Sequence, residues 1–127
     1  MVAKEKMNIA VIGASADREK FGNKCVRAYV SKGYVVFPVN PKQDIIEELK
    51  CYKSILDISE DIDIVSVYLP SFVFSKIVEE IINKKPKKIY FNPGTYDEMI
   101  AQKIKKAGIE VIAACSIVAI GVSPSNI

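Results

Sequence analysis

The residues most suited to chemistry lie near the start of the chain, where a short apolar stretch runs into a glycine. Residues 8–12 lead into Gly13-Ala14-Ser15, and after a polar loop Gly22-Asn23 opens a predicted helix. This order is typical of the first turn of a βαβ unit, where the loop and the helix N-terminus offer free backbone N–H groups to an anion, usually a phosphate. The segment therefore indicates a nucleotide-type ligand, the alternative being an ordinary strand-to-helix turn that needs a glycine.

The loop lacks the G-x-G-x-x-G fingerprint of dinucleotide-binding folds, because Ser15 and Arg18 stand where the later glycines would be. The next predicted strand ends in Asn40-Pro41-Lys42, without the Asp or Glu that usually bonds the ribose hydroxyls. A neutral residue followed by a cation suits a ribose that carries a phosphate, as in NADP or coenzyme A. The alternative for Lys42 is a solvated loop lysine.

The elements that must position these residues alternate between strands and helices. Continuous apolar runs predict buried strands, and apolar stripes with a 3.6-residue period predict helices. We expect strands at residues 8–12, 34–39, 63–69, 88–91 and 109–114, and helices at 23–32, 71–84 and 95–107. Gly33 and Gly108 are expected to end helices.

Three caps are predicted as well. Ser71 is expected to cap the second helix, and Thr95 with Glu98 to form a capping box on the third. The stretch 42–60 is expected to hold one or two short helical turns, one of them capped by Ser54. The tail 116–127 receives no assignment.

This alternation predicts an α/β fold, a Rossmann-like open parallel sheet of five strands with helices on both faces. Right-handed crossovers give the strand order 2-1-3-4-5. Residues 1–127 are expected to form one domain with its core at 8–115. Ligands of such sheets bind beyond the carboxyl ends of the strands. The segments expected along that edge are Gly13-Ala14-Ser15, Asn40-Pro41-Lys42, Leu69-Pro70-Ser71, Asn92-Pro93-Gly94 and Ala114-Cys115.

Composition argues against several classes of function. The chain has no histidine, so it lacks the commonest general base and metal ligand, and no metal site is expected. The net charge of +3 is too small to indicate nucleic acid, and the basic run 84–88 is expected at the opposite edge of the sheet. No apolar run reaches the ~20 residues of a membrane span. Without a signal peptide or a C-x-x-C pair, the expected setting is the cytoplasm, with reduced thiols.

One ordered set of residues extends along most of the chain. It comprises Gly13-Ala14-Ser15, Gly22-Asn23, Gly33-Tyr34, Pro38-Val39-Asn40-Pro41, Cys51-Tyr52, Asp63, Pro70, Pro93-Gly94, Ala107-Gly108 and Cys115. In this order the set resembles the small stand-alone CoA-binding proteins, whose domain is similar to the N-terminal CoA-binding domain of the succinyl-CoA synthetase alpha subunit. The chain departs from many of these relatives at Asn92, where they have glutamine, and at Ala114, where they have arginine.

The resemblance implies coenzyme A or an acyl-CoA as the ligand, with contacts running from the diphosphate to the thiol. The loop Gly13, Ala14, Ser15 and Arg18, with Gly22 and Asn23, would hold the diphosphate. Asn40, Pro41 and Lys42 would meet the adenosine and its 3′-phosphate. Leu69 and Pro70 would border the adenine or the pantetheine path, and Asn92, Pro93 and Gly94 the pantetheine arm. Cys115 is a possible thiol contact or a core cysteine, while Cys25 and Cys51 are expected to be packing residues.

The implied role is that of a binding, sensor or carrier protein. The synthetase needs a phosphohistidine on a later domain, and this chain has no histidine and no evident pair of a nucleophile and a base. The alternatives are an NADP-dependent oxidoreductase module, although no Tyr-x-x-x-Lys pattern exists, and a fold used only for protein–protein contact. The expected protein partner is either a second copy of the chain, which would give a homodimer, or an unidentified acyl-CoA enzyme.

Overall fold

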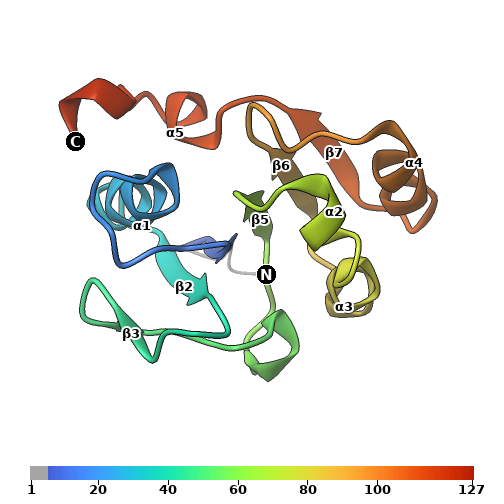
Figure 1. The fold of residues 1–127 in the computed structure, drawn as a ribbon, viewed down its shortest axis with the longest axis horizontal. Helices are drawn as coiled ribbons and strands as arrows, with labels where there is room; N and C mark the ends of the chain where they lie inside the picture. Colours follow the sequence, from blue (N-terminus) through green and yellow to red (C-terminus); the bar gives the residue numbers. More distant parts are fainter. Residues whose placement is uncertain (1–5) are drawn as a thin grey trace, which may run out of the picture.

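The computed structural model describes residues 6–127, whose five main strands lie parallel in one sheet (Figure 1). These strands are β1 (Asn8–Ile12), β2 (Val35–Val39), β5 (Ile64–Val67), β6 (Lys88–Phe91) and β7 (Glu110–Ala113). Their order is β2-β1-β5-β6-β7, which confirms the predicted order for strands counted along the chain. Each strand reads as an apolar run because both faces of the sheet are covered.

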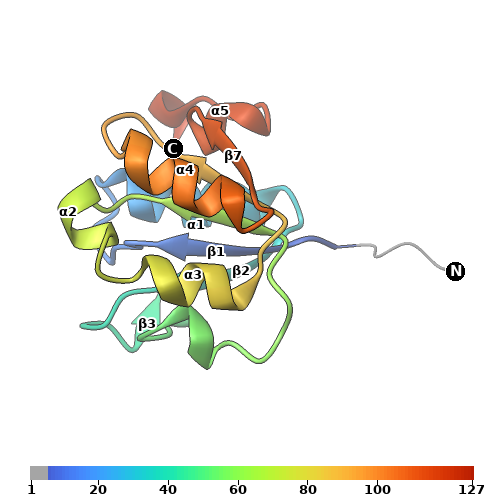
Figure 2. The same cartoon turned by 90° about the vertical axis from the view of Figure 1, so that its right-hand side faces the viewer.

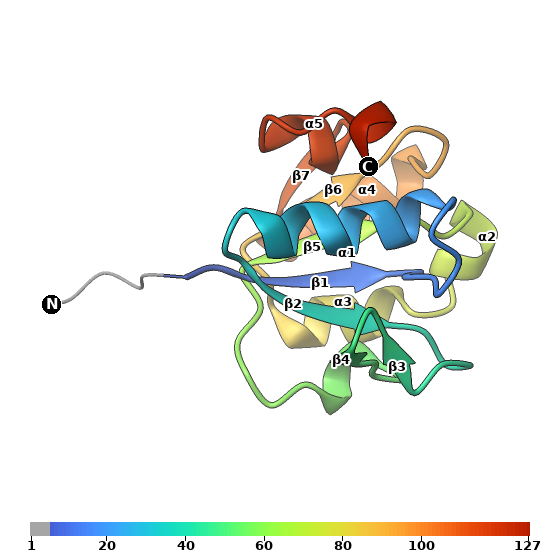
Figure 3. The same cartoon turned by 90° about the vertical axis from the view of Figure 1, so that its left-hand side faces the viewer.

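Helices cover the sheet on both faces, as predicted. Helices α1 (Phe21–Ser31) and α5 (Ser116–Ala119) lie on one face (Figure 3), and α2 (Ser71–Phe74), α3 (Val78–Lys84) and α4 (Glu98–Lys106) on the other (Figure 2). Side chains alternate along β1: Ile9 and Val11 pack toward α1, and Ala10 and Ile12 toward α3. The fold is therefore a three-layer, Rossmann-like α/β domain.

The strands end level with one another. Ile12 pairs with Val39 on one side and with Val67 on the other, and Val67 pairs with Phe91 in the next strand. The residues that follow the strands therefore meet along a single carboxyl edge. The candidate site lies on this edge.

Two of the predicted helix ends are confirmed. Gly33 follows α1 with φ of 84°, and its N–H donates a hydrogen bond to Val30 O at 3.1 Å. Gly108 follows α4 with φ of 88°. Both take the left-handed conformation that glycine adopts at least cost.

Three predictions about helices are wrong. The helix expected over 71–84 is two helices, α2 and α3, because the backbone leaves helical geometry at Ile77, with φ of −120°. Ser71 does not cap α2, since it lies inside the first turn and Pro70 holds the cap position. Thr95 does not cap α4 either: its hydroxyl donates to Asn92 O, and Asp97 caps the helix by accepting from Ile100 N at 3.0 Å.

The stretch 42–60 contains a small antiparallel hairpin that the sequence analysis did not predict. It consists of β3 (Ile45–Ile46) and β4 (Leu49–Lys50), joined by Glu47 and Glu48 in left-handed conformation. The 3-10 turn η1 (Ile55–Asp57) follows, capped as predicted by Ser54, whose hydroxyl accepts from Leu56 N at 3.1 Å.

The unassigned tail packs on α1. It forms α5 and a second 3-10 turn, η2 (Pro124–Asn126). Tyr29 donates its hydroxyl to Ser116 O at 2.7 Å, and Lys24 donates to Pro124 O at 3.2 Å. In the described part of the chain no helix is both long and apolar enough to span a membrane.

Candidate ligand-binding site

The loop after β1 lies tightly against the end of β5. Gly13 has φ of 85°, and its N–H donates to Val39 O at 3.1 Å. A Cβ atom at this position would lie 3.0 Å from Leu69 Cδ2 and 3.1 Å from the carbonyl carbon of Tyr68. Both the backbone conformation and the space therefore require glycine.

Helix α1 begins directly against this loop. A Cβ atom at Gly22 would lie 2.5 Å from Gly13 O, a distance that side chains do not tolerate. The cap residue Lys20 makes no side-chain hydrogen bond to the first turn of α1. The N–H groups of Phe21 and Gly22 therefore have no hydrogen-bond partner among residues 6–127 and lie at the positive end of the helix. Two glycines thus bring a loop and a helix N-terminus together as a cradle that suits a phosphate.

Asn40 joins the end of β2 to the cradle. Its Nδ2 donates to Ala14 O at 2.8 Å, its Oδ1 accepts from Lys42 N at 2.8 Å, and its backbone N–H donates to Tyr52 O at 2.9 Å. These bonds use the Asn40 amide within the protein and fix the turn that carries Pro41 and Lys42. Among the described residues the Lys42 ammonium has no hydrogen bond or ion pair, and it is exposed.

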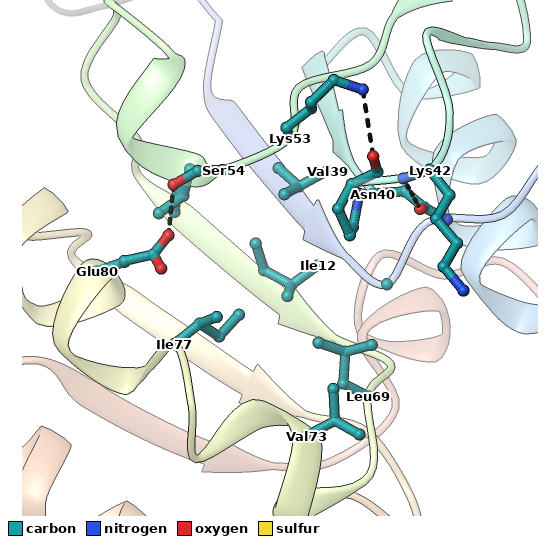
Figure 4. Close-up of a pocket in the computed structure, with 13 residues that line it drawn as sticks. Ile12, Val39, Asn40, Lys42, Lys53, Ser54, Leu69, Val73, Ile77 and Glu80 are labelled. Atoms are coloured by element: carbon teal, nitrogen blue, oxygen red, sulfur yellow. Dashed lines mark hydrogen bonds between the residues drawn. The ribbon is translucent and has the colours of Figure 1, made fainter.

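A cavity of about 470 Å³ opens beside this turn (Figure 4). Most of its wall is aliphatic, and its polar side chains come from the turn after β2, from η1 and from α3. The lining residues are Ile12, Gly13, Val39, Asn40, Pro41, Lys42, Lys53, Ser54, Ile55, Leu69, Val73, Ile77 and Glu80. The cavity suits a flat apolar ring with a charged group at its mouth.

Two further hollows continue from this cavity along the carboxyl edge. A hollow of about 420 Å³ shares Gly13, Asn40 and Leu69 with the cavity. A smaller one of about 120 Å³ shares Phe21, Tyr68 and Pro93 with that second hollow, and Cys115 lines it. Because neighbouring hollows share walls, we treat the three as one trough, which runs from Glu80 past the glycine cradle to Cys115.

A buried polar network supports the Cys115 end of the trough. Asn92 donates to Ser66 Oγ at 2.9 Å and to Val67 O at 2.8 Å, and it accepts from Ser116 N at 2.8 Å. Asn92 is 2% exposed, so its side chain holds α5 on the sheet from beneath the trough. Cys115 is partly buried at the start of α5.

The other two cysteines are buried, in keeping with the expected packing role. Cys25 lies 3.6 Å from Ser116 Oγ, and Cys51 lies behind the turn at Asn40, 3.6 Å from its carbonyl oxygen. Burial raises the pKa of both thiols. Cys115 is less buried than these two and lines the trough.

The structure brings most of the predicted site residues together on the trough. They are Gly13, Ala14, Ser15, Gly22, Asn40, Pro41, Lys42, Leu69, Asn92, Pro93 and Cys115. Four others are not among its lining residues, namely Arg18, Asn23, Pro70 and Gly94.

Two of these four are engaged by the hairpin. Glu47 Oε2 lies 3.3 Å from Arg18 Nε and accepts from Asn23 Nδ2 at 3.0 Å. Asn23 also donates to Ser15 O at 2.9 Å, so it braces the loop after β1 from behind.

Several lining residues were not predicted from the sequence. Phe21, Tyr68, Lys53 and Glu80 line the trough but were not named as site residues. Tyr68 directly follows β5, so the rule that ligands lie beyond strand ends would have found it. Nothing in the local sequence marks Glu80, which reaches the cavity only because the chain turns between α2 and α3.

The comparisons with known proteins agree with this architecture. A family model for the CoA binding domain matches residues 7–121. This chain belongs to the CoA-binding domain family. The uncharacterized protein YneT of Bacillus subtilis is 28% identical over 111 residues, which cover 87% of this chain and 82% of that protein. A hypothetical protein of Pyrococcus horikoshii has a solved structure with a TM-score of 0.85 and 31% identity, covering 91% of this chain and 81% of that one.

Larger relatives contain the same domain as a part. The ADP-forming acetate–CoA ligase of Methanocaldococcus jannaschii is 38% identical over 73 residues, which are 58% of this chain but only 10% of the ligase. The dinucleotide-forming acetyl-coenzyme A synthetase 1 of Ca. Korarchaeum cryptofilum, solved with phosphate and ADP, has a TM-score of 0.74 and 25% identity, covering 84% of this CoA-binding domain and 25% of that chain. The predicted resemblance is confirmed.

Proposed function

We propose that this chain binds coenzyme A, or a short acyl-CoA, along the trough at the carboxyl edge of its sheet. The observation that carries the proposal is the sequence of environments in the trough: an aliphatic cavity, a glycine cradle at a helix N-terminus, and a hollow that ends at Cys115. CoA has the same order of parts, since its adenosine, diphosphate and pantetheine thiol follow one another.

The cradle fits a diphosphate. Gly13 and Gly22 lack the Cβ atoms that would fill the space between loop and helix, and the first N–H groups of α1 supply donors. The side chains of Arg18 and Asn23, which were expected to contact the diphosphate, already pair with Glu47. A diphosphate would have to compete with this carboxylate for them. Direct diphosphate contacts are therefore best assigned to the backbone of the loop and helix.

Two lysines support a phosphate on the ribose. Lys42 and Lys53 both line the cavity at the end of β2. Lys53 donates to Pro41 O at 3.2 Å and pairs with Asp44 at 3.6 Å, whereas the Lys42 ammonium has no such partner in the described part of the chain and can turn toward a ligand. A CoA 3′-phosphate would meet Lys42, and Pro41 and Leu69 would border the adenosine. Tyr68 and Pro93 would border the pantetheine arm.

The proposed role is binding, as a sensor or carrier, rather than catalysis by this chain alone. The trough contains Ser54 bonded to Glu80 and a single cysteine, Cys115, and the sequence has no histidine to serve as a base. Since the domain forms part of larger CoA ligases among its relatives, a separate acyl-CoA enzyme is the partner we favour.

Thermal unfolding in the presence of ligands tests the proposal. CoA at 100 times its dissociation constant should add about 2.7 kcal/mol to the free energy of unfolding. For a domain of this size the midpoint should rise by roughly 10 °C. Dephospho-CoA and NADP at the same concentration should raise it less. A larger shift with NADP would favour the oxidoreductase alternative, and no shift with any of the three would favour a fold used for protein contacts.

A further inference from the structure

The adenosine cavity has a polar pair at the end farthest from Lys42 (Figure 4). Ser54 comes from the start of η1 and Glu80 from α3, and the Ser54 hydroxyl donates to Glu80 Oε1. Ser54 Oγ also accepts from Leu56 N at 3.1 Å, so the hydroxyl is bound on both sides. The pair therefore holds the Glu80 carboxylate in one orientation at the end of an aliphatic cavity.

The remaining oxygen of this carboxylate is available to a ligand. Within the described part of the chain, Glu80 Oε2 has no hydrogen bond or ion pair, whereas the neighbouring Glu79 pairs with Lys103 outside the cavity. An ionised carboxylate accepts hydrogen bonds and donates none. The cavity thus offers an acceptor at one end and the cation of Lys42 at the other, with Ile12 and Ile77 between them.

An adenosine 3′-phosphate has the complementary arrangement. Its phosphate is anionic, its purine ring is flat and apolar on both faces, and its exocyclic amine is a hydrogen-bond donor at the far edge of the base. We propose that Glu80 recognises this exocyclic amine and selects adenine, and that Ser54 is the positioning residue for its carboxylate. The inference rests on the proposed binding of CoA in this trough.

The charges also fix which way the adenosine lies. A phosphate placed beside Glu80 would meet a like charge, and an amine placed beside Lys42 would meet a donor instead of an acceptor. The opposite orientation is therefore disfavoured at both ends. With the base at Glu80, the ribose is directed toward Lys42 and the diphosphate toward Gly13.

The test compares CoA with a CoA analogue whose base is unsubstituted purine, which differs from adenine only by having hydrogen in place of the amine. Calorimetry gives the dissociation constant of each ligand for the whole chain. The wild-type chain should bind the analogue at least about tenfold more weakly than CoA, because the analogue lacks one hydrogen bond to a charged group. Glu80→Ala should weaken CoA by the same factor and leave the analogue unchanged, so the ratio of the two constants approaches one.

Two further variants separate recognition from structure. Glu79→Ala removes an adjacent carboxylate that faces away from the cavity, and it should keep the wild-type ratio. Glu80→Gln retains the side-chain shape and an amide oxygen acceptor, so the ratio of the two dissociation constants should be intermediate. This variant tests the proposal even if Glu80→Ala does not fold. If the Glu80 variants weaken the binding of both ligands equally, so that the ratio of the two dissociation constants is unchanged, the proposed role of Glu80 is overturned. Failure of the wild-type chain to bind CoA would overturn the proposed function as well.

Discussion

The amide of Asn40 donates to the carbonyl oxygen of Ala14 across 2.8 Å and thereby ties the end of β2 to the loop after β1. The same side chain accepts from Lys42 N at 2.8 Å. Asn40→Ala should lower the free energy of unfolding by about 1–3 kcal/mol, because it leaves a partly buried carbonyl and an N–H without these partners. Urea denaturation measures this, with Asn83→Ala on the exposed side of α3 as the control, expected within about 0.5 kcal/mol of wild type. An equal loss in both variants would contradict the structural role of Asn40.

A substitution at Gly13 should remove CoA binding while the chain stays folded. In Gly13→Val the side chain would press on Leu69 and on the backbone of Tyr68, and it would keep a ligand away from the loop backbone. The variant should show native circular dichroism, a lower midpoint and no measurable affinity for CoA.

A matched control separates space from backbone strain. Gly108 has almost the same φ as Gly13, 88° against 85°, but a Cβ there meets nothing within 4 Å. Gly13→Ala and Gly108→Ala both adopt the left-handed conformation at a cost of about 1–2 kcal/mol. Only Gly13→Ala should weaken CoA in a calorimetric titration, and equal affinities in the two variants would remove this loop from the site.

Lys42 should distinguish CoA from dephospho-CoA. Lys42→Ala should weaken CoA by about 1–2 kcal/mol, the range of an exposed charge-assisted hydrogen bond, and should leave dephospho-CoA nearly unaffected. Lys32→Ala, at the end of α1, is the control and should change neither ligand. Equal weakening of both ligands by Lys42→Ala would place this lysine on the diphosphate instead of the 3′-phosphate.

Cys115 should exchange with CoA disulfide. The Cys115 thiolate attacks one sulfur, a mixed disulfide with CoA forms, and the second CoA leaves as its thiolate. Mass spectrometry should detect one added CoA, reversed by dithiothreitol and absent in Cys115→Ser.

The other cysteines serve as internal controls for that exchange. Cys25 and Cys51 are buried and burial raises the pKa of each thiol, so both are poor nucleophiles at neutral pH. Cys25→Ser and Cys51→Ser should form the adduct at the wild-type rate. An adduct on Cys25 or Cys51 in place of Cys115 would move the thiol end of the trough.

The parallel sheet was predictable because its signals are local and agree with one another. Each strand is a continuous apolar run, Gly33 and Gly108 close helices, and right-handed crossovers leave few possible strand orders. The expected strand ends placed Gly13, Asn40, Leu69 and Asn92 along one edge of the sheet. Their membership in a binding site remains a prediction, although the trough brings them together.

Tertiary contacts outweigh local signals at the places where the structure differs from the sequence-based predictions. The break between α2 and α3 has no local signal, because the apolar stripe over 71–84 continues through Ile77. In the structure Phe74 is buried in the core, while Val73 and Ile77 line the cavity. Thr95 is held by Asn92 O, which leaves Asp97 to cap α4. The hairpin at 45–50 was missed because its turn is Glu47-Glu48, without the Asn or Gly that usually takes positive φ.

Backbone NMR of the 127-residue chain during a titration with CoA is the decisive measurement for CoA binding at the carboxyl edge, because it reports both binding and location. We expect large shifts of the amide signals of Gly13, Gly22, Lys42 and Leu69 that saturate at one CoA per chain, with the signals of Gly108 and Gly121 unmoved. CoA binding at this edge of the sheet is contradicted if saturating CoA moves none of these four signals, or if the shifts gather elsewhere, for example at Met99 and Lys103 on α4.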